Sequence, residues 1–129
     1  MPNYYQGVNS EIIQHPVIQQ IVKSLEDRKG KDIVILNTGK AKGAVWDFFV
    51  ICSGDSTTQV QALAEHVEEE TRRNTSVRPL HIEGLQNCEW VLLDYSDVAV
   101  HIFLPERREF YGLEYLWVDV PHYRIDQKI

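Results

Sequence analysis

The fold of this chain is decided by the segment from Trp46 to Leu63, which reads WDFFVICSGDSTTQVQAL. Its first part, up to Cys52, is aromatic and β-branched without alternation, which predicts a strand covered on both faces. Gly54-Asp55 then turns the chain, and Ser56 followed by Gln59 is the capping-box pattern of a helix start. The segment therefore predicts a buried strand that leads through a tight turn into a helix.

Outward from this segment, hydrophobic periodicity predicts four more strands and two more helices. The expected elements are helices at about 10–27, 56–73 and 105–117 and strands at 33–36, 46–52, 77–83, 89–94 and 98–104. Pro16 interrupts the first helix, which either begins there or has a kinked first turn. Pro79 indicates an edge strand, and Tyr95-Ser-Asp97 is short enough to join the last two strands as an antiparallel hairpin. This order predicts an α/β fold with a mixed five-stranded sheet flanked by helices.

The composition is that of one globular domain. The chain has 129 residues, 43% of them hydrophobic and 25% charged, so we expect a single domain over 1–129 with its core at about 10–119 and a tail at 120–129. No apolar run approaches the ~20 residues that span a bilayer, and the first residues lack a signal or transit pattern. We therefore expect a cytoplasmic protein with no membrane partner. The net charge of −6 disfavours a long phosphate-backbone footprint and permits a basic protein as partner.

No residue pattern predicts a catalytic centre. Gly54 before a helix start could hold an anion, but a single glycine is more often only a tight turn. Asp94 and Asp97 flank a hairpin turn, where carboxylates are ordinary turn formers, and they are not the alternating pair that ligands on one sheet face require. Cys52 lies in an apolar run, which is typical of a buried structural cysteine rather than a nucleophile. We expect no cofactor.

The histidines and cysteines also lack the spacing of a metal site. No two of the five histidines are four residues apart, and no Cys-x-x-Cys occurs, so no zinc site is predicted. His101 lies in an otherwise apolar strand, and we expect it to be a hydrogen-bonded residue of the sheet. Cys52 and Cys88 are too few for a disulfide framework, so both are expected to be free thiols.

Aromatic residues gather in the last third of the chain: Trp90, Tyr95, Phe110, Tyr111, Tyr115 and Trp117. Such side chains are enriched among the anchors of protein interfaces. The helical spacing of Phe110 and Trp117 predicts that these two are core residues. Trp90 and Tyr95 belong to a hairpin that can turn one face outward, so they are either core residues or part of an interface.

Four motifs then occur in a familiar order: DFFVICSGDS (47–56), QVQA (59–62), WVLLDYSDVAVHIF (90–103) and REFYGLEYLW (108–117). Over about Ile13 to Asp119 they resemble the ribosomal silencing factor family, also called the Iojap-like proteins. Ser96 stands where the family usually has glycine in the hairpin, which leaves only the turn type open. The tail from Pro121 is longer than in many members.

The resemblance implies a nucleotidyltransferase-like α/β domain that lacks the catalytic carboxylates, and a translational repressor rather than an enzyme. Members of the family bind the large ribosomal subunit through the universal ribosomal protein number fourteen, at the face where the small subunit docks. They thereby block subunit joining and lower translation when nutrients are scarce. An acidic chain fits a basic ribosomal protein better than it fits rRNA, so we expect no direct nucleic-acid site.

We predict a partner-binding site on the hairpin and the last helix, formed by Trp90, Asp94, Tyr95, Asp97 and Tyr111. The aromatic rings would supply contact area, and the two aspartates would supply charge to Lys or Arg of the partner. Three alternatives stay open. The chain could be a metal-dependent nucleotidyltransferase-like enzyme that uses Gly54, Ser56 and the Asp94/Asp97 pair, or an RNA-binding protein. An edge strand near Pro79 also leaves a homodimer possible.

Overall fold

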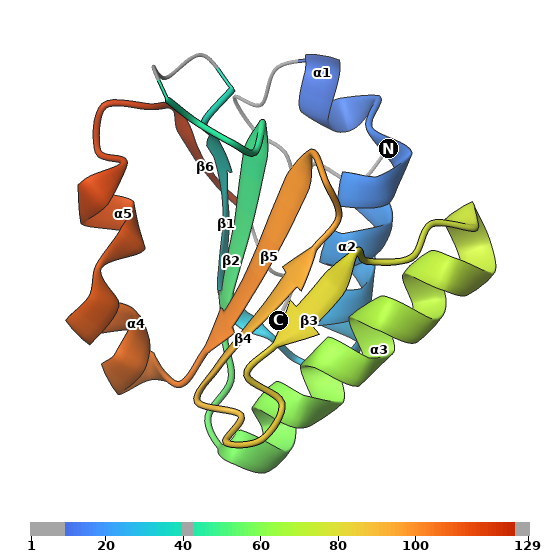
Figure 1. The fold of residues 1–129 in the computed structure, drawn as a ribbon, viewed down its shortest axis with the longest axis vertical. Coiled ribbons are helices and arrows are strands. Elements are labelled where there is room, and N and C mark those ends of the chain that lie inside the picture. The colour runs from blue at the N-terminus through green and yellow to red at the C-terminus, as the bar shows by residue number, and fades with distance from the viewer. Residues whose placement is uncertain (1–9, 40–42, 126–129) are drawn as a thin grey trace.

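The computed structural model describes residues 10–39 and 43–125, in which a mixed sheet separates two layers of helices (Figure 1). The helices are α1 (Ser10–Ile13), α2 (Pro16–Asp27), α3 (Thr57–Thr75), α4 (Pro105–Tyr111) and α5 (Leu113–Leu116). The strands are β1 (Lys31–Asn37), β2 (Phe48–Ser53), β3 (His81–Glu83), β4 (Trp90–Asp94), β5 (Val98–Phe103) and β6 (His122–Arg124). The strand order is β3-β4-β5-β2-β1-β6, and only the β2–β5 pair is parallel. The predicted α/β class with a mixed sheet is confirmed.

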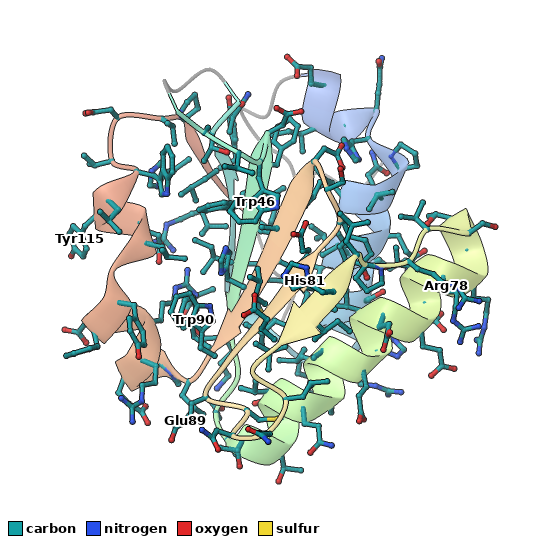
Figure 2. All side chains as sticks on the ribbon, viewed as in Figure 1. Trp46, Arg78, His81, Glu89, Trp90 and Tyr115 are labelled. Atoms are coloured by element: carbon teal, nitrogen blue, oxygen red, sulfur yellow. The ribbon has the colours of Figure 1, made fainter. Side chains whose placement is uncertain are left out.

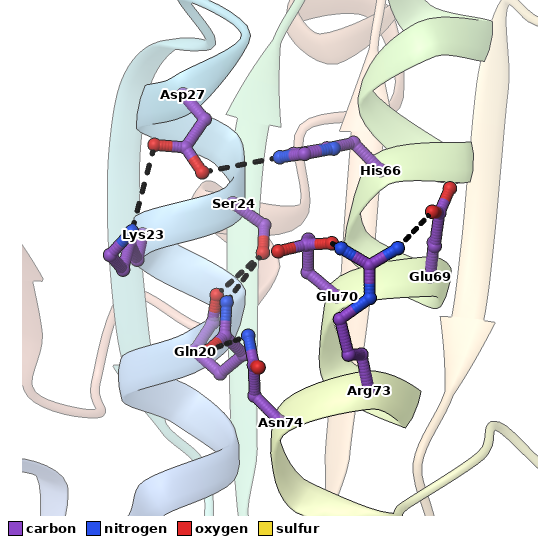
Figure 3. A network of polar contacts seen from close by, with 9 residues as sticks. All are labelled: Gln20, Lys23, Ser24, Asp27, His66, Glu69, Glu70, Arg73 and Asn74. Atoms are coloured by element: carbon purple, nitrogen blue, oxygen red, sulfur yellow. Dashed lines mark hydrogen bonds and ion pairs between the residues drawn. The ribbon is translucent and has the colours of Figure 1, made fainter.

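The main core lies between the sheet and the helices α2 and α3. The apolar stripes of both helices are fully buried here, against the β2 and β5 side chains that point to the same face. Each fully buried Leu, Ile or Val contributes roughly 1.5–3 kcal/mol relative to an exposed position. Figure 3 shows the polar contacts along the outer seam of the two helices: His66 lies 3.1 Å from Asp27, and Asn74 donates to Gln20 at 3.0 Å.

The strand–turn–helix segment forms as predicted. Ser56 is the N-cap of α3, and its Oγ accepts a hydrogen bond from the Gln59 amide at 3.1 Å. The Gln59 side chain reaches back to the Asp55 amide at 2.6 Å, one residue earlier than in the standard capping box. The Gly54 amide donates to the Phe103 carbonyl at 2.9 Å. The amides of Gly54, Asp55 and Gln59 around this helix start are therefore already used within the chain.

The first helix is interrupted at Pro16, as the sequence indicated. α1 and α2 are separate helices, with Pro16 in the first turn of α2 and His15 as its N-cap. The Nδ1 atom of His15 accepts from the Ile18 amide at 3.2 Å, which satisfies one of the free amides of the helix start. No helix in the described ranges is long and apolar enough to cross a bilayer.

The helix predicted over 105–117 is two short helices on the second face of the sheet. Gly112 adopts a left-handed conformation with φ of 59° and ends α4, and α5 begins at the next residue. The break turns Phe110 outward, where it is 75% exposed, so the prediction that Phe110 is a core residue is wrong. Trp117 does pack against the sheet, with its ring edge-on to Phe49 at 5.8 Å between ring centres.

The prediction of five strands and an irregular tail is also wrong. β6 pairs antiparallel with β1, and the Ile125 amide then donates to the Ile33 carbonyl at 3.0 Å. Ile125 is buried, so the chain is fixed to the sheet as far as this residue. The rest of the predicted tail, 126–129, lies outside the described residues. The β3 strand next to Pro79 is an edge strand, as predicted.

Both cysteines are free and buried. Burial raises the pKa of Cys52 to about 12 and also raises the pKa of Cys88. We expect thiol titration in denaturant to find two reactive groups per chain. In the native protein we expect Cys52 to react only as fast as the surrounding structure opens, because the thiolate is the reactive species. Fewer than two thiols in freshly purified, denatured protein would contradict the prediction.

Candidate partner-binding surface

The face of the sheet opposite α2 and α3 is only partly covered. α4 and α5 lie along one side of it, and the side formed by β3 and β4 has no helix over it (Figure 1). Strand register places alternate residues of β3 and β4 on this face. We name this region the open face, and it consists of Trp46, His81, Glu83, Trp90, Leu92 and Asp94. Figure 2 shows Trp46, His81 and Trp90 along it.

Trp90 is a half-buried aromatic residue in the middle of a ring cluster. It lies opposite Phe103 in the β4–β5 register and stacks on that ring at 4.9 Å between centres. The Tyr111 ring of α4 lies 4.6 Å from Trp90 on another side. The indole Nε1 donates to Nδ1 of His101 at 3.1 Å, which fixes the ring plane. Trp90 is thus held in one orientation while part of its surface stays accessible, as an interface anchor requires.

Asp94 is an ionised carboxylate at the end of the open face. Its Oδ1 accepts from the Trp46 indole at 3.0 Å and from the Ser96 amide at 2.9 Å. The ring of His81 lies 3.7 Å from its second oxygen. Burial alone would raise the pKa of Asp94, but these two hydrogen bonds and His81 hold it below its usual value. Asp94 is 8% exposed, so it positions Trp46 and the turn more than it offers its own surface.

The other two hairpin residues of the predicted site lie elsewhere. Tyr95 is 4% exposed and belongs to the main core on the opposite side of the sheet, where burial raises its pKa to about 12. Asp97 points to the start of α2, and its carboxylate lies 2.8 Å from Nε2 of His15. Of the five predicted residues, the structure therefore brings Trp90 and Tyr111 into contact and keeps Asp94 on the same face of the sheet, at the other end of β4. The Tyr95 ring has almost no surface to offer a partner.

Sequence reasoning missed four members of this surface: Trp46, His81, Glu83 and Leu92. The alternation from Trp90 along β4 already pointed to Leu92, but the register of β3 and the position of Trp46 depend on contacts between distant segments. Three exposed apolar residues in loops next to these strands were also missed: Val45, Leu80 and Leu85, which are 79%, 72% and 45% exposed. Exposed apolar side chains near half-buried aromatics are typical of a recognition surface.

The residues named for the enzymatic alternative are not brought to one site. Gly54 and Ser56 follow the carboxyl end of β2, whereas the register pairs the first residue of β2 with Val98, next to the Asp94–Asp97 turn. The two groups therefore lie at opposite ends of the parallel strand pair. Among the described residues, no group of three or more His, Cys, Asp or Glu side chains could hold a metal ion.

Comparison with known proteins finds relatives over most of the chain. The family model described as "Ribosomal silencing factor during starvation" matches residues 11–129. The ribosomal silencing factor RsfS of Halalkalibacterium halodurans is 38% identical over 105 residues, which cover 81% of this chain and 88% of that protein. RsfS of Bacillus subtilis is 34% identical over 108 residues, covering 84% and 90%. A crystal structure of a Chromobacterium violaceum protein is similar with a TM-score of 0.75 at 38% identity, covering 80% of this chain and 84% of that one.

Proposed function

The chain belongs to the ribosomal silencing factor (RsfS) family, and on this premise we propose that it represses translation by binding the large ribosomal subunit and blocking subunit joining. The proposed contact is the universal large-subunit protein number fourteen, at the face where the small subunit docks. Repression would operate when nutrients are limiting. The proposed action is steric, so it requires an interface and no turnover.

The observation that carries this proposal is the open face, with Trp90 held in one orientation at the end next to α4. Trp90 is stacked and hydrogen-bonded, so little side-chain freedom remains to be lost on binding. Trp46, Leu92 and Tyr111 extend the apolar area on either side. A standard interface buries about 800 Å² on each partner.

The charge of the open face fits a basic partner. Glu83 and Asp94 flank His81, whose Nε2 lies 3.1 Å from the Glu83 carboxylate, and the whole chain carries a net charge of −6. Lys and Arg side chains of a ribosomal protein would meet the exposed Glu83 carboxylate at the rim of the interface, and the buried Asp94 carboxylate would add to the negative potential there. Such complementarity favours the association rate and the choice of partner more than raw affinity.

We expect the tagged protein to co-sediment with free large subunits and to be absent from joined ribosomes. Purified protein added to a mixture of both subunits should lower the fraction of joined ribosomes, and the same protein added to pre-joined ribosomes should have less effect. Equal amounts of the protein on joined ribosomes and on free large subunits would contradict the steric mechanism.

A second measurement separates a protein contact from an rRNA contact. Binding to the isolated ribosomal protein is expected to account for most of the affinity, with a modest salt dependence. Binding through rRNA would instead fall steeply with salt, because each neutralised phosphate releases counterions. If the protein binds the intact subunit but does not bind the isolated ribosomal protein, the contact belongs to another component of the subunit.

A further inference from the structure

A crevice of about 390 Å³ lies at the other side of α4 from the ring cluster, and it shares no residue with the open face. It is placed just beyond the carboxyl ends of β2 and β5, since Ser53 ends β2 and Pro105 follows β5. These two strands are adjacent and parallel. The chain leaves β2 for α3 on one face of the sheet and leaves β5 for α4 on the opposite face (Figure 1). Such a switch point is where open α/β sheets generally bind their ligands.

One charged pair is built into the wall of this crevice. The Arg108 guanidinium donates to both carboxylate oxygens of Glu114, at 2.8 and 3.2 Å, and to the Ser53 hydroxyl at 2.9 Å. The Arg108 side chain is only 13% exposed, so the pair is held in place by the fold. Because Arg108 and Glu114 neutralise each other, the ligand preference is set by the remaining charges.

The three remaining charged side chains, Arg124, Asp32 and Glu109, make no hydrogen bond or ion pair within the described ranges, although Lys31 attracts Asp32 through space. Asp32 also has an unusual backbone, with φ of 52° at the irregularity where the β1–β2 register shifts. A left-handed residue in a strand bulge costs energy and re-aims its side chain, and such features gather next to binding sites. The crevice thus presents one unpaired cation and two unpaired carboxylates.

We propose that this crevice binds a small molecule that carries a carboxylate and additional amino or guanidino groups, of the basic amino acid type. The carboxylate would pair with the Arg124 guanidinium, and the positive groups with Asp32 and Glu109. The lining carries three acidic and two basic side chains, so a ligand with one net positive charge balances it. Tyr115 borders the crevice and offers a ring to an alkyl chain or a cation. The volume is in the range of small-molecule sites. This proposal does not depend on ribosome binding.

The test is an amide chemical-shift titration of the full chain with L-arginine and L-lysine. Saturable shifts are expected at the amides of Asp32, Ser53 and Gly112. Agmatine, which lacks the carboxylate, and L-leucine, which lacks the second cation, are expected to bind at least about tenfold more weakly. Absence of saturable binding in the millimolar range, or equal binding of agmatine and L-arginine, would overturn the proposal.

Variants of the chain make the test specific to the crevice. Asp32→Asn keeps a residue type that tolerates the left-handed backbone, and Arg124→Gln keeps most of the side-chain length. Each is expected to weaken L-arginine binding at least about tenfold. Glu68→Gln and Arg78→Gln change exposed charges outside the crevice lining and serve as matched controls with unchanged binding. Equal affinity in all four variants would show that the effect of arginine is nonspecific and would end the proposal. Thermal midpoints of the four variants verify that each is folded.

Discussion

Replacement of Trp90 by alanine is expected to weaken binding to the large subunit by about 2 kcal/mol or more, which is roughly thirtyfold in affinity. The ring supplies fixed apolar area on the open face, and its loss also removes the ring contact with Tyr111. Sedimentation or equilibrium binding with purified subunits measures the change. The same variant should lose about 2–3 kcal/mol of folding stability, because the half-buried ring packs on Phe103 and His101.

The loss of stability must be separated from the loss of affinity, and Trp117 provides the matched control. It is also a half-buried tryptophan of the same sheet face, it packs on Phe49, and it is not part of the open face. Trp117→Ala is expected to lower the free energy of unfolding by a similar amount and to leave affinity for the subunit within about twofold. Equal losses of affinity in the two variants, measured well below both melting midpoints, would remove Trp90 from the interface.

The elements whose residues act locally were predictable from the sequence. Ser56 and Gln59 form the expected cap of α3, and Pro79 lies beside an edge strand. The alternation that puts Trp90 and Asp94 on one face also puts the next residue, Tyr95, on the other. Strand alternation thus predicts the buried position of Tyr95, whereas its aromatic character alone fits either the core or an interface.

The features that the sequence did not predict depend on contacts between distant segments and on the conformation of one glycine. β6 has three residues and no periodicity, and it is a strand only because β1 offers an unpaired edge. Its existence therefore depends on a partner strand about ninety residues earlier in the sequence. The sequence shows a glycine at position 112 within the helical pattern, but it does not show that Gly112 adopts a φ of 59° and ends the helix. The end of α4 at Gly112 decides that Phe110 faces solvent. Trp46 reaches Asp94 across 48 positions in sequence, which no local pattern can indicate.

His101 is expected to make the protein sensitive to acid. It is 4% exposed, and burial lowers its pKa from 6.5 to about 4. Its Nδ1 accepts the Trp90 hydrogen bond, and its Nε2 has no partner among the described residues, so the neutral ring is the form that fits. In the unfolded chain the ring binds a proton near pH 6.5, whereas in the folded chain it does so only near pH 4.

The lower pKa of His101 in the folded chain decides how stability changes with pH. Between pH 6.5 and 4 the unfolded state holds more protons than the folded state, so stability falls as the pH falls through this range. The full loss is about 3 kcal/mol, and below pH 4 this group contributes no further change.

Chemical denaturation at several pH values measures this loss of stability. His101→Gln keeps an acceptor for Trp90 but does not titrate, so its stability should change less over the same range. Contributions from the other groups of the chain are common to both proteins and cancel in the difference. Parallel curves for the two proteins would show that His101 does not carry the acid sensitivity.

Protonation of His101 would also affect Trp90. The added proton would occupy the Nδ1 lone pair that accepts the hydrogen bond from the Trp90 indole. Affinity for the large subunit should therefore fall together with stability in the wild-type protein, and less in the variant.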